Sequence, residues 1–515
     1  MNVLRPFAFA VCLLFAFGFS QAFAEKTRVV ILADMGNEPD EEQQMAHMLM
    51  YCNDFKLEGL IAVSGKPLNS GRNDEFKSKL HPELFHELIS EYGKVRTNLM
   101  LHADDWPTET YLHEIVKPGI VHYGIAAVGD GKATEGTNLI LECVKRNLSD
   151  GNLFLVVNAG SNSLAQALWD LDKDESISAS DKTTMLSRIF VFENGAQDNA
   201  GAWITKNFPA ITWYRSNYQT YAYGGKENAR AAGTYCWEPF PFSGRGQHQW
   251  TSKHVQQNHG PLGQRYPDRG KGRAFVEGGG TIAWIGLANR GLFSPWHMWW
   301  GGWGGRVSRE KHKNVMSRHP SIVNGVVFKG SSFAPAEKTL LDFMVYEADS
   351  EIETWTDPVH GTEFNHFQVP VWRFRRAMWN DFRARMDWCV LPFGEANHNP
   401  IAVLNGDSSD QILIEKRTTP GTTIQLNAGG SSDPDNDELY YRWWHYREAG
   451  TYSNSVTIQQ PHVSNTTFVV PEDAQPGDEI HIILEVRDHR QEMASPDSDD
   501  YIPLTDYRRL VIQLK

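Results

Sequence analysis

Residues 29–47 decide the fold of the first half of this chain, and they read Val29-Val30-Ile31-Leu32-Ala33-Asp34-Met35-Gly36-Asn37-Glu38-Pro39-Asp40-Glu41-Glu42-Gln43-Gln44-Met45-Ala46-His47. An apolar run over residues 29–32 ends in a turn that holds five acidic residues. Apolar residues then return at helical spacing, at Met45, Met48 and Leu49. The pattern predicts a buried strand, a carboxylate-lined turn and a helix.

The acidic turn has two interpretations. Ligands and catalytic groups of α/β folds gather at the carboxyl ends of strands, where this turn lies. Carboxylates so close together repel one another, and a hard cation such as Ca²⁺ removes that repulsion while it activates water. Alternatively, Asp34 and Glu38 only cap the next helix and interact with its dipole. Taken alone, the stretch leaves both a cation site and a helix cap open.

The N-terminus has the pattern of a signal peptide. A single Arg5 precedes an apolar core over residues 7–19, and Ala22-Phe23-Ala24 follows before the charged Glu25. We expect cleavage after Ala24, so that residues 1–24 are a signal peptide and the protein is secreted or periplasmic. An uncleaved anchor is the alternative. Since no other stretch is long and apolar enough to cross a bilayer, we expect no membrane span in the mature protein.

Charge and cysteine content argue against two classes of site. The 515-residue chain has 49 basic and 63 acidic residues, a net charge of -14, and no long basic stripe. We therefore expect no binding to a nucleic acid backbone. Four cysteines follow the signal peptide, and their wide spacing argues against a zinc site: Cys52, Cys143, Cys236 and Cys389. Disulfides and buried free thiols both stay open, and the pairing cannot be read.

From Thr27 to about Trp213, strand-like and helix-like segments alternate. Segments 59–63 and 153–157 have the apolar composition of buried strands, whereas segment 82–92 has apolar residues on one helical face. Alternation of this kind predicts a mostly parallel sheet flanked by helices. We place this α/β domain at residues 25–395.

The middle of this domain, residues 224–306, is rich in glycine and aromatic residues. It includes Trp296-His297-Met298-Trp299-Trp300-Gly301-Gly302-Trp303-Gly304-Gly305-Arg306. We expect long loops over the mouth of the α/β domain, where aromatic rings stack on sugars or bases. The alternative, which is compatible with the first, is that the aromatic residues pack against the domain itself. Segment 372–388 is predicted to be a helix, and its apolar stripe is expected to pack in the core.

After residue 397 the pattern changes to short alternating strands. Clusters of Pro, Gly, Asn and Asp separate these strands, as in the stretch 431–437. Strands of this length and spacing predict an all-β, immunoglobulin-like sandwich over residues 397–515. The predicted chain is therefore an α/β domain followed by a β-sandwich. No heptad or interface stripe reveals an oligomeric state.

Three motifs resemble those of the inosine-uridine-type nucleoside hydrolases. Those enzymes begin with a strand that ends in Asp-x-Asp-x-Gly-x-Asp-Asp, and residues 32–41 keep part of this pattern, with Leu32 at its first aspartate and Pro39 as an insertion. The family's Thr-Asn before an apolar helix corresponds to Ser161-Asn162. A ribose-binding segment corresponds to Gln197-Asp198-Asn199.

Over nearly the whole mature chain, the sequence is similar to a secreted, nucleoside-hydrolase-like family often labelled cellulose-binding protein. Its motifs are Asn37-Glu38-Pro39-Asp40, Gly129-Asp130-Gly131-Lys132-Ala133-Thr134-Glu135-Gly136, Gln197-Asp198, Gly301-Gly302-Trp303-Gly304-Gly305-Arg306 and Asp381-Phe382-Arg383-Ala384-Arg385-Met386-Asp387-Trp388. The C-terminal stretch 431–443 resembles the turn and strand of polycystic-kidney-disease-type modules. Its acidic turn either binds Ca²⁺ or, more simply, holds a tight loop by side-chain hydrogen bonds.

The hydrolase resemblance implies a role for each matching residue. Asp34 is expected to bind Ca²⁺ and to act as the general base toward water. The other implied ion ligands are Asp40 and the backbone carbonyl of Ser161. The implied sugar-binding residues are Glu38, Asn162, Asp198 and Asn199.

One departure from the family bears on the ion site. Where the wider secreted family has Glu-Gly-Asp-Thr, this chain reads Glu277-Gly278-Gly279-Gly280-Thr281, so Gly279 stands at the expected aspartate. Either Glu277 substitutes as the ion ligand, or the ion site is weakened or lost. Two functions follow. The favoured one is a Ca²⁺-dependent hydrolase of an N-ribosyl or related glycosyl bond in a sugar or nucleoside-like molecule. The other is a non-catalytic protein that binds a cellulose-like polysaccharide on a degenerate hydrolase scaffold.

Overall fold

A computed structural model describes residues 26–36, 39–65, 79–194, 198–216, 219–222, 225–226, 248–267, 275–277, 279–288, 291–313, 344–489 and 503–515. Segment 1–24, Glu38 and Cys236 lie outside the described residues, so the expectations for them stay predictions. Much of the glycine-rich stretch 224–306 is likewise outside, although its aromatic end is described.

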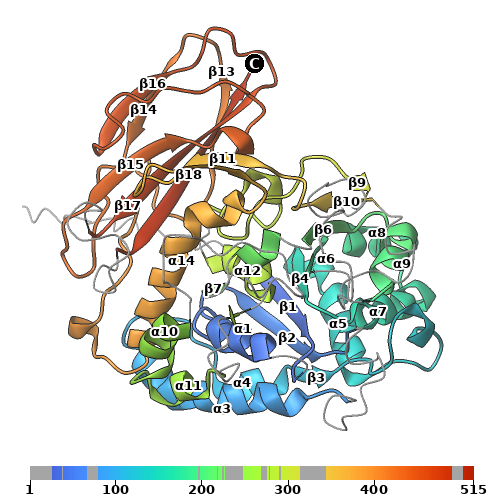
Figure 1. Ribbon diagram of the computed structural model, residues 1–515. Helices are drawn as coiled ribbons and strands as arrows, with labels where there is room; N and C mark the ends of the chain where they lie inside the picture. The colour runs from blue at the N-terminus through green and yellow to red at the C-terminus, as the bar shows by residue number, and fades with distance from the viewer. Residues whose placement is uncertain are drawn as a thin grey trace, which may run out of the picture.

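The first part of the chain folds around one eight-stranded sheet (Figure 1). The strand order is β3-β2-β1-β4-β5-β6-β10-β9, and neighbours are parallel except for β9, which pairs antiparallel with β10. The strands are β1 (Arg28–Ala33), β2 (Lys56–Ala62), β3 (Val116–Pro118), β4 (Leu153–Val157), β5 (Ile189–Asn194), β6 (Thr212–Ser216), β9 (His312–Lys313) and β10 (Met344–Glu347). The predicted parallel sheet is confirmed.

Helices cover both faces of this sheet and bury two apolar cores. In β1, Val29 and Ile31 belong to one core and Val30 and Leu32 to the other, because successive side chains of a strand point to opposite faces. The helices over the first core are α1 (Pro39–Leu49), α3 (Pro82–Leu99), α12 (Gly280–Ile285) and α14 (Val369–Asp387). Those over the second core are α5 (Glu135–Lys145), α7 (Ser161–Lys173), α8 (Ala179–Ser187) and α9 (Ala200–Asn207).

Shorter elements connect these layers. The remaining helices with bounds are α4 (Glu109–Glu114), α6 (Asn147–Asp150), α10 (His248–Thr251) and α11 (Gly260–Arg265). β7 (Gly225–Lys226) pairs antiparallel with β8 (Phe275–Val276), and β11 (Glu353–Thr356) forms a hairpin with β12 (Glu363–His366). The apolar stripe expected on segment 372–388 lies on α14, where Phe374, Met378, Phe382 and Met386 are buried in the first core.

The strand order reverses at the centre of the sheet. After β1 the chain adds β2 and β3 on one side, and it then returns to place β4 on the other side of β1. The helices that follow β1 and β4 therefore lie on opposite faces, since α1 covers one core and α7 the other. In open α/β sheets a crevice forms at such a point, outside the carboxyl ends of the two strands. The acidic turn follows β1 at this point.

The C-terminal part is a β-sandwich, as predicted. Its larger sheet has the order β13-β18-β17-β15, and β14 and β16 form the smaller sheet. The strands are β13 (Leu413–Thr418), β14 (Thr423–Asn427), β15 (Tyr440–His445), β16 (Asn465–Val469), β17 (Glu479–Arg487) and β18 (Thr505–Leu514). Trp443, Phe468 and Leu484 meet in a third apolar core between the two sheets.

The sandwich packs directly on the α/β domain (Figure 1). Tyr446 and Tyr507 of the sandwich share the first apolar core with Phe374 of α14 and with Trp303. Arg509 of β18 donates to the carbonyl oxygens of Leu292 and Gly301, both at 2.9 Å. The described end of the aromatic stretch is therefore largely enclosed between the two parts.

This packing corrects the expectation that the aromatic stretch lies over the mouth of the α/β domain. Trp300 and Trp303 are only 5% and 2% exposed. The Trp296 ring lies 4.7 Å from that of Phe190, which is near the beginning of β5 and thus at the amino edge of the sheet. For residues 293–303, packing against the protein itself is the correct alternative, because the sandwich needs an apolar partner at this junction.

Two further expectations concern membranes and thiols. None of the helices within the described residues is long and apolar enough to span a membrane. Cys52, Cys143 and Cys389 are buried free thiols, and burial raises the pKa of Cys52 and of Cys143 to about 12. For these three cysteines the structure favours the free-thiol alternative over disulfides.

Candidate functional site

The candidate site begins at the acidic turn that follows β1. Asp34 comes directly after the strand and is 2% exposed, because β1 lies inside the sheet between β2 and β4. Helix α1 begins at Pro39 and has Asp40, Glu41 and Glu42 in its first turn, where acidic side chains interact favourably with the helix dipole. Glu41 is buried, although it is charged at neutral pH in water. The turn therefore directs carboxylates inward as well as toward solvent.

Electrostatic repulsion is the main feature of this turn. Burial, followed by the charges of Asp34 and Asp40, holds the pKa of Glu41 well above its usual range. Hydrogen bonds from the side-chain amides of Gln44 and Asn158 act in the opposite direction. Three acidic groups thus lie close enough to disfavour one another's ionisation, and a cation at this edge of the sheet would offset that cost.

Buried amide oxygens lie at the carboxyl ends of β4 and β5. Asn158 follows β4, and its backbone N–H donates to the carbonyl of Leu32 at 3.0 Å. Its side-chain N–H donates to Glu41 at 3.4 Å, which leaves the amide oxygen of Asn158 buried and without a hydrogen bond among the described residues. The amide oxygens of Asn162 and Asn194 are also buried and make no hydrogen bond among the described residues. Because a buried acceptor without a partner is costly, these oxygens fit a cation or a ligand hydroxyl.

Asp198 joins two helices beside the acidic turn. Its carboxylate accepts from the Ser161 hydroxyl and from the backbone N–H of Asn162 at 3.1 Å, at the beginning of α7. It also accepts from the backbone N–H of Ala200 at 2.8 Å, at the beginning of α9. The chain enters α7 through Gly160, where φ is +60° and a β-carbon would lie only 2.5 Å from that of Val63. Asp198 therefore fixes the helix starts that frame the site.

Three of the expected sugar-binding residues, Asn162, Asp198 and Asn199, lie together, but they contact the protein. The Asn199 side-chain oxygen accepts from the backbone N–H of Ile125 at 2.8 Å. The Asn162 side-chain N–H donates to the carbonyl of His122 at 2.6 Å. Both side chains thus hold the loop that precedes α5. The structure brings Ser161, Asn162, Asp198 and Asn199 into one cluster, and their roles toward a ligand stay predictions.

The expected substitute ligand, Glu277, has protein partners at both carboxylate oxygens. His47 Nδ1 lies 3.0 Å from each oxygen, the Tyr266 hydroxyl donates to one at 2.7 Å, and the Thr281 hydroxyl donates to the other at 2.6 Å. Glu277 is fully buried, and its charge is the main influence after burial that raises the pKa of Tyr266. Since each oxygen already has two partners, the structure gives Glu277 an internal structural role.

Gly279, which stands at the family's aspartate, has no room for a side chain. A β-carbon added to Gly279 would lie 2.6 Å from Cγ2 of Thr220 and 2.8 Å from the amide oxygen of Asn194. The Thr220 hydroxyl donates to the carbonyl of Gly279, which holds this close approach in place. Asn194, at the end of β5, thus takes the space next to Gly279, and it brings an amide oxygen instead of a carboxylate.

Within the described residues, three His, Cys, Asp or Glu ligand atoms converge within 4.8 Å only in the sandwich, at Asp437, Asp488 and His489. There His489 lies 2.9 Å from Asp488, and this contact raises the pKa of the imidazole. Asp433 accepts from the backbone N–H groups of Asp435 and Asp437, as in the tight-loop interpretation of this acidic turn. The carboxylates of Asp34, Asp40 and Glu41 do not converge to that distance, so the β1 edge offers oxygen donors that suit Ca²⁺ without a preformed cage.

Sequence reasoning placed Glu41 in the acidic turn without giving it a role of its own, and it missed Asn158 and Asn194. Glu41 lies inside the acidic turn, but its inward direction depends on α1 beginning at Pro39. Asn158 directly follows the apolar run of β4, so the rule that ligands gather at the carboxyl ends of strands would have found it. Asn194 ends β5 and would have been found in the same way.

A family model described as the cellulose-binding Sde182, nucleoside hydrolase-like domain matches residues 28–307. The chain belongs to the Sde182 family. A second model, the C-terminal domain of the cellulose-binding protein Sde0182, matches residues 423–514. Both parts of the fold thus have counterparts in the family, and no curated protein sequence matches the chain.

A solved structure extends the Sde182 match to the full length. It is described as a nucleoside hydrolase-related hypothetical protein from Saccharophagus degradans that is associated with carbohydrate metabolism. The two chains are 30% identical with a TM-score of 0.73, and the match covers 95% of this chain and 100% of the other. The chain therefore shares its nucleoside-hydrolase-like fold with this solved structure.

Proposed function

We propose that this protein is an exported hydrolase that cleaves an N-ribosyl or related glycosyl bond at the carboxyl edge of its parallel sheet. The observation that carries the proposal is the burial of Asp34 and Glu41 beside Asp40 at the point where the strand order reverses. Burying several carboxylates together is unfavourable unless a cation or a reaction uses them. A helix cap alone does not require Glu41 to be buried.

Asp34 is the best candidate for the general base. It directly follows β1, a strand inside the sheet, so the fold holds it in a fixed position, and its two carboxylate oxygens accept protons or ligands. It would take a proton from the water that attacks the anomeric carbon, while an oxocarbenium-like charge develops on the sugar. Asn162, Asp198 and Asn199 keep the neighbouring loop and helix starts in place around that sugar.

The donor set fits Ca²⁺, because it consists of carboxylate and amide oxygens. Asp34 and Asp40, the carbonyl of Ser161 and the buried oxygen of Asn158 would hold the ion. A bound Ca²⁺ would lower the pKa of an attacking water and bind sugar hydroxyls. Glu277 is left out of this set, because its oxygens are occupied by His47, Tyr266 and Thr281.

A second candidate function is polysaccharide binding without catalysis. It is favoured by the crowding at Gly279, since the lost aspartate cannot be restored without moving Asn194 or Thr220. The description of the Sde182 family as cellulose-binding also supports it. Under this alternative, the sheet edge binds sugar without activating water.

Calorimetric titration of Ca²⁺ into chelator-treated protein, beside a product-release assay over nucleosides and oligosaccharides, distinguishes the two functions. We expect Ca²⁺ binding and release in the wild type, and loss of release by at least about a hundredfold in Asp34→Asn, as for a removed general base. Asp172→Asn, at an exposed position of α7, is the matched control. Absence of both Ca²⁺ binding and release in the wild type would contradict the hydrolase and favour the binder.

A further inference from the structure

An open cleft lies between the α/β domain and the sandwich, on the side of the sheet opposite to Asp34. It has a volume of about 680 Å³ and is lined by residues 26–28, 150–152, 293–297 and 409–412, together with Trp300 and Ile414. The first two segments lead into β1 and β4, so the cleft is at the amino edge of the sheet. The length of β1 separates this edge from Asp34 by roughly 20 Å.

The floor of the cleft is aromatic. His297 stacks on Trp300 with ring centres 4.3 Å apart, and the Trp300 indole N–H donates to Glu479 of the sandwich at 3.1 Å. Trp296 packs its ring against Phe190, and both Trp296 and His297 keep part of their surface exposed. The contacts with Phe190 and Trp300 already hold the Trp296 and His297 rings in place. Binding a flat ligand to these rings therefore costs little side-chain conformational entropy.

Neutral polar groups stand at the rim. Asn152 and Gln411 make no side-chain hydrogen bond within the described part of the chain, so their amides are available to a ligand. Both are at least partly exposed. An amide offers donors and an acceptor together, which suits the hydroxyl groups of a sugar.

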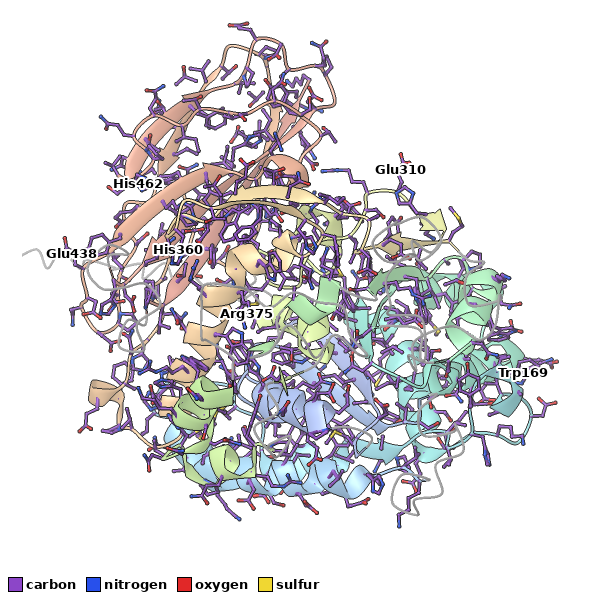
Figure 2. All side chains as sticks on the ribbon, viewed as in Figure 1. Trp169, Glu310, His360, Arg375, Glu438 and His462 are labelled. Atoms are coloured by element: carbon purple, nitrogen blue, oxygen red, sulfur yellow. The ribbon has the colours of Figure 1, made fainter. Side chains whose placement is uncertain are left out.

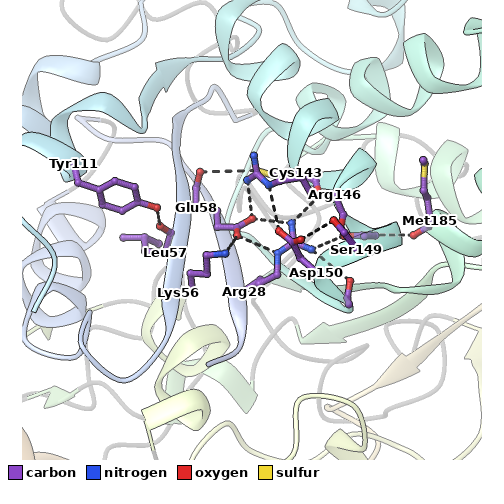
Figure 3. Close-up of polar contacts among 12 residues, drawn as sticks. Arg28, Lys56, Leu57, Glu58, Tyr111, Cys143, Arg146, Ser149, Asp150 and Met185 are labelled. Carbon is purple, nitrogen blue, oxygen red and sulfur yellow. Dashed lines mark hydrogen bonds and ion pairs between the residues drawn. The ribbon is translucent and has the colours of Figure 1, made fainter. Parts of the chain in front are cut away.

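The charges around the cleft cancel. Lys26 and Arg28 oppose Asp150 and Asp410 among the lining residues, which gives no net formal charge. Lys26 pairs with Asp105 at 2.8 Å, and the buried Arg28 pairs with Glu58 at 2.8 Å (Figure 3). An anionic ligand therefore finds no unpaired Lys26 or Arg28 cation here, and a neutral ligand is favoured.

We propose that this cleft is an anchoring site for a neutral polysaccharide, with the apolar face of a pyranose ring stacked on Trp296 and its hydroxyl groups bound by Asn152 and Gln411. The inference rests on the proposed carbohydrate ligand class, and it adds a second site to that function. Because the cleft and Asp34 lie at opposite edges of the sheet, an anchored chain leaves the hydrolase edge open to a substrate. The parts of Trp296 and His297 that stay exposed beside the sandwich would thereby contact the ligand.

The test measures retention of the full mature protein on microcrystalline cellulose and its affinity for cellohexaose, both with a chelator present. The chelator makes the result independent of the Ca²⁺ site, so failure here and failure of the hydrolase proposal are distinguishable. We expect Trp296→Ala to weaken binding by about tenfold or more, as for other buried aromatic anchors. Asn152→Ala combined with Gln411→Ala should weaken it several-fold while leaving the aromatic floor intact.

Trp169→Ala is the matched control. Trp169 is a partly exposed tryptophan of α7 that projects from the side of the α/β domain away from the sandwich (Figure 2). The Trp169→Ala variant should bind cellulose as the wild type does, and circular dichroism should show that every variant is folded. Wild-type binding by both the Trp296 variant and the double amide variant would overturn the proposal. No retention of the wild type on cellulose and no binding of cellohexaose would overturn it as well.

Discussion

Asn194 lies so close to Gly279 that a β-carbon at Gly279 would stand 2.8 Å from the Asn194 amide oxygen. The contact explains how the chain accommodates a glycine where its relatives are expected to have an aspartate. The side-chain amide of Asn194, at the end of β5, occupies the space next to Gly279. Its oxygen is buried and makes no hydrogen bond within the described residues. The two positions are therefore coupled, and they should be changed together.

We predict that Gly279→Asp alone destabilises the protein, because its β-carbon overlaps both Asn194 and Thr220. The expected loss in the free energy of unfolding is about 1–3 kcal/mol, as for other overpacked sites. Asn194→Ala in the same chain removes one of the two overlaps and should recover part of that loss. Denaturant unfolding of the two single variants and the double variant measures the coupling. If the losses in unfolding free energy of the two single variants add up to that of the double variant, Asn194 does not fill this space.

The second prediction concerns the pH dependence of stability. Burial, partly opposed by the Arg215 charge, raises the pKa of Glu193 to about 7 from a usual value near 4.5. The folded state then binds more protons than the unfolded state between these two pH values. The contribution of Glu193 to the free energy of unfolding should therefore be greatest below about pH 4.5 and should fall as the pH rises to about 7. The expected fall is on the order of 3 kcal/mol.

Denaturant unfolding from pH 4.5 to pH 7.5 tests this prediction. Glu193→Gln should remove most of the Glu193 contribution, since glutamine stays neutral and can still accept the Trp213 indole N–H. Glu175→Gln, at an exposed position, should leave the slope unchanged. Asp506 of the sandwich has a pKa raised to about 7 by burial, so part of the slope will persist in the Glu193 variant. An identical slope in wild type and Glu193→Gln would contradict the assignment.

The buried strands and the aromatic stretch differ in how readily the sequence predicts their positions. Continuous apolar runs such as β1 and β4 are buried on both faces, so composition alone identifies them as central parallel strands. The position of Trp296 could not be predicted in this way, because it depends on the sandwich covering an apolar surface of the first domain. An aromatic residue in a glycine-rich loop looks the same whether it lies over a crevice or under a neighbouring domain.

The candidate site shows the same limit. Asp34 is predicted as a site residue because it directly follows a strand, which is a property of the local sequence. Glu277 was assigned to the ion by alignment with a family motif, whereas its partners His47 and Tyr266 come from α1 and from the residue after α11. Hydrogen bonds between segments so distant in sequence decide whether a carboxylate is available, and no local pattern reveals them.

The last prediction concerns the junction between the two parts, which Arg509 holds together. Its guanidinium donates to the carbonyls of Leu292 and Gly301 and lies 2.8 Å from His481 Nδ1, all in a fully buried position. Arg509→Ala would leave both carbonyl oxygens buried without a partner, at a cost of roughly 2–5 kcal/mol. We expect calorimetry to show separate unfolding of the sandwich and the α/β domain in this variant. Arg447→Ala, which removes a 43% exposed side chain of the sandwich, should keep the wild-type transition. If both variants unfold in one unchanged transition, the apolar contacts of Tyr446 and Tyr507 are sufficient to hold the junction, and Arg509 contributes only to the local packing of β18.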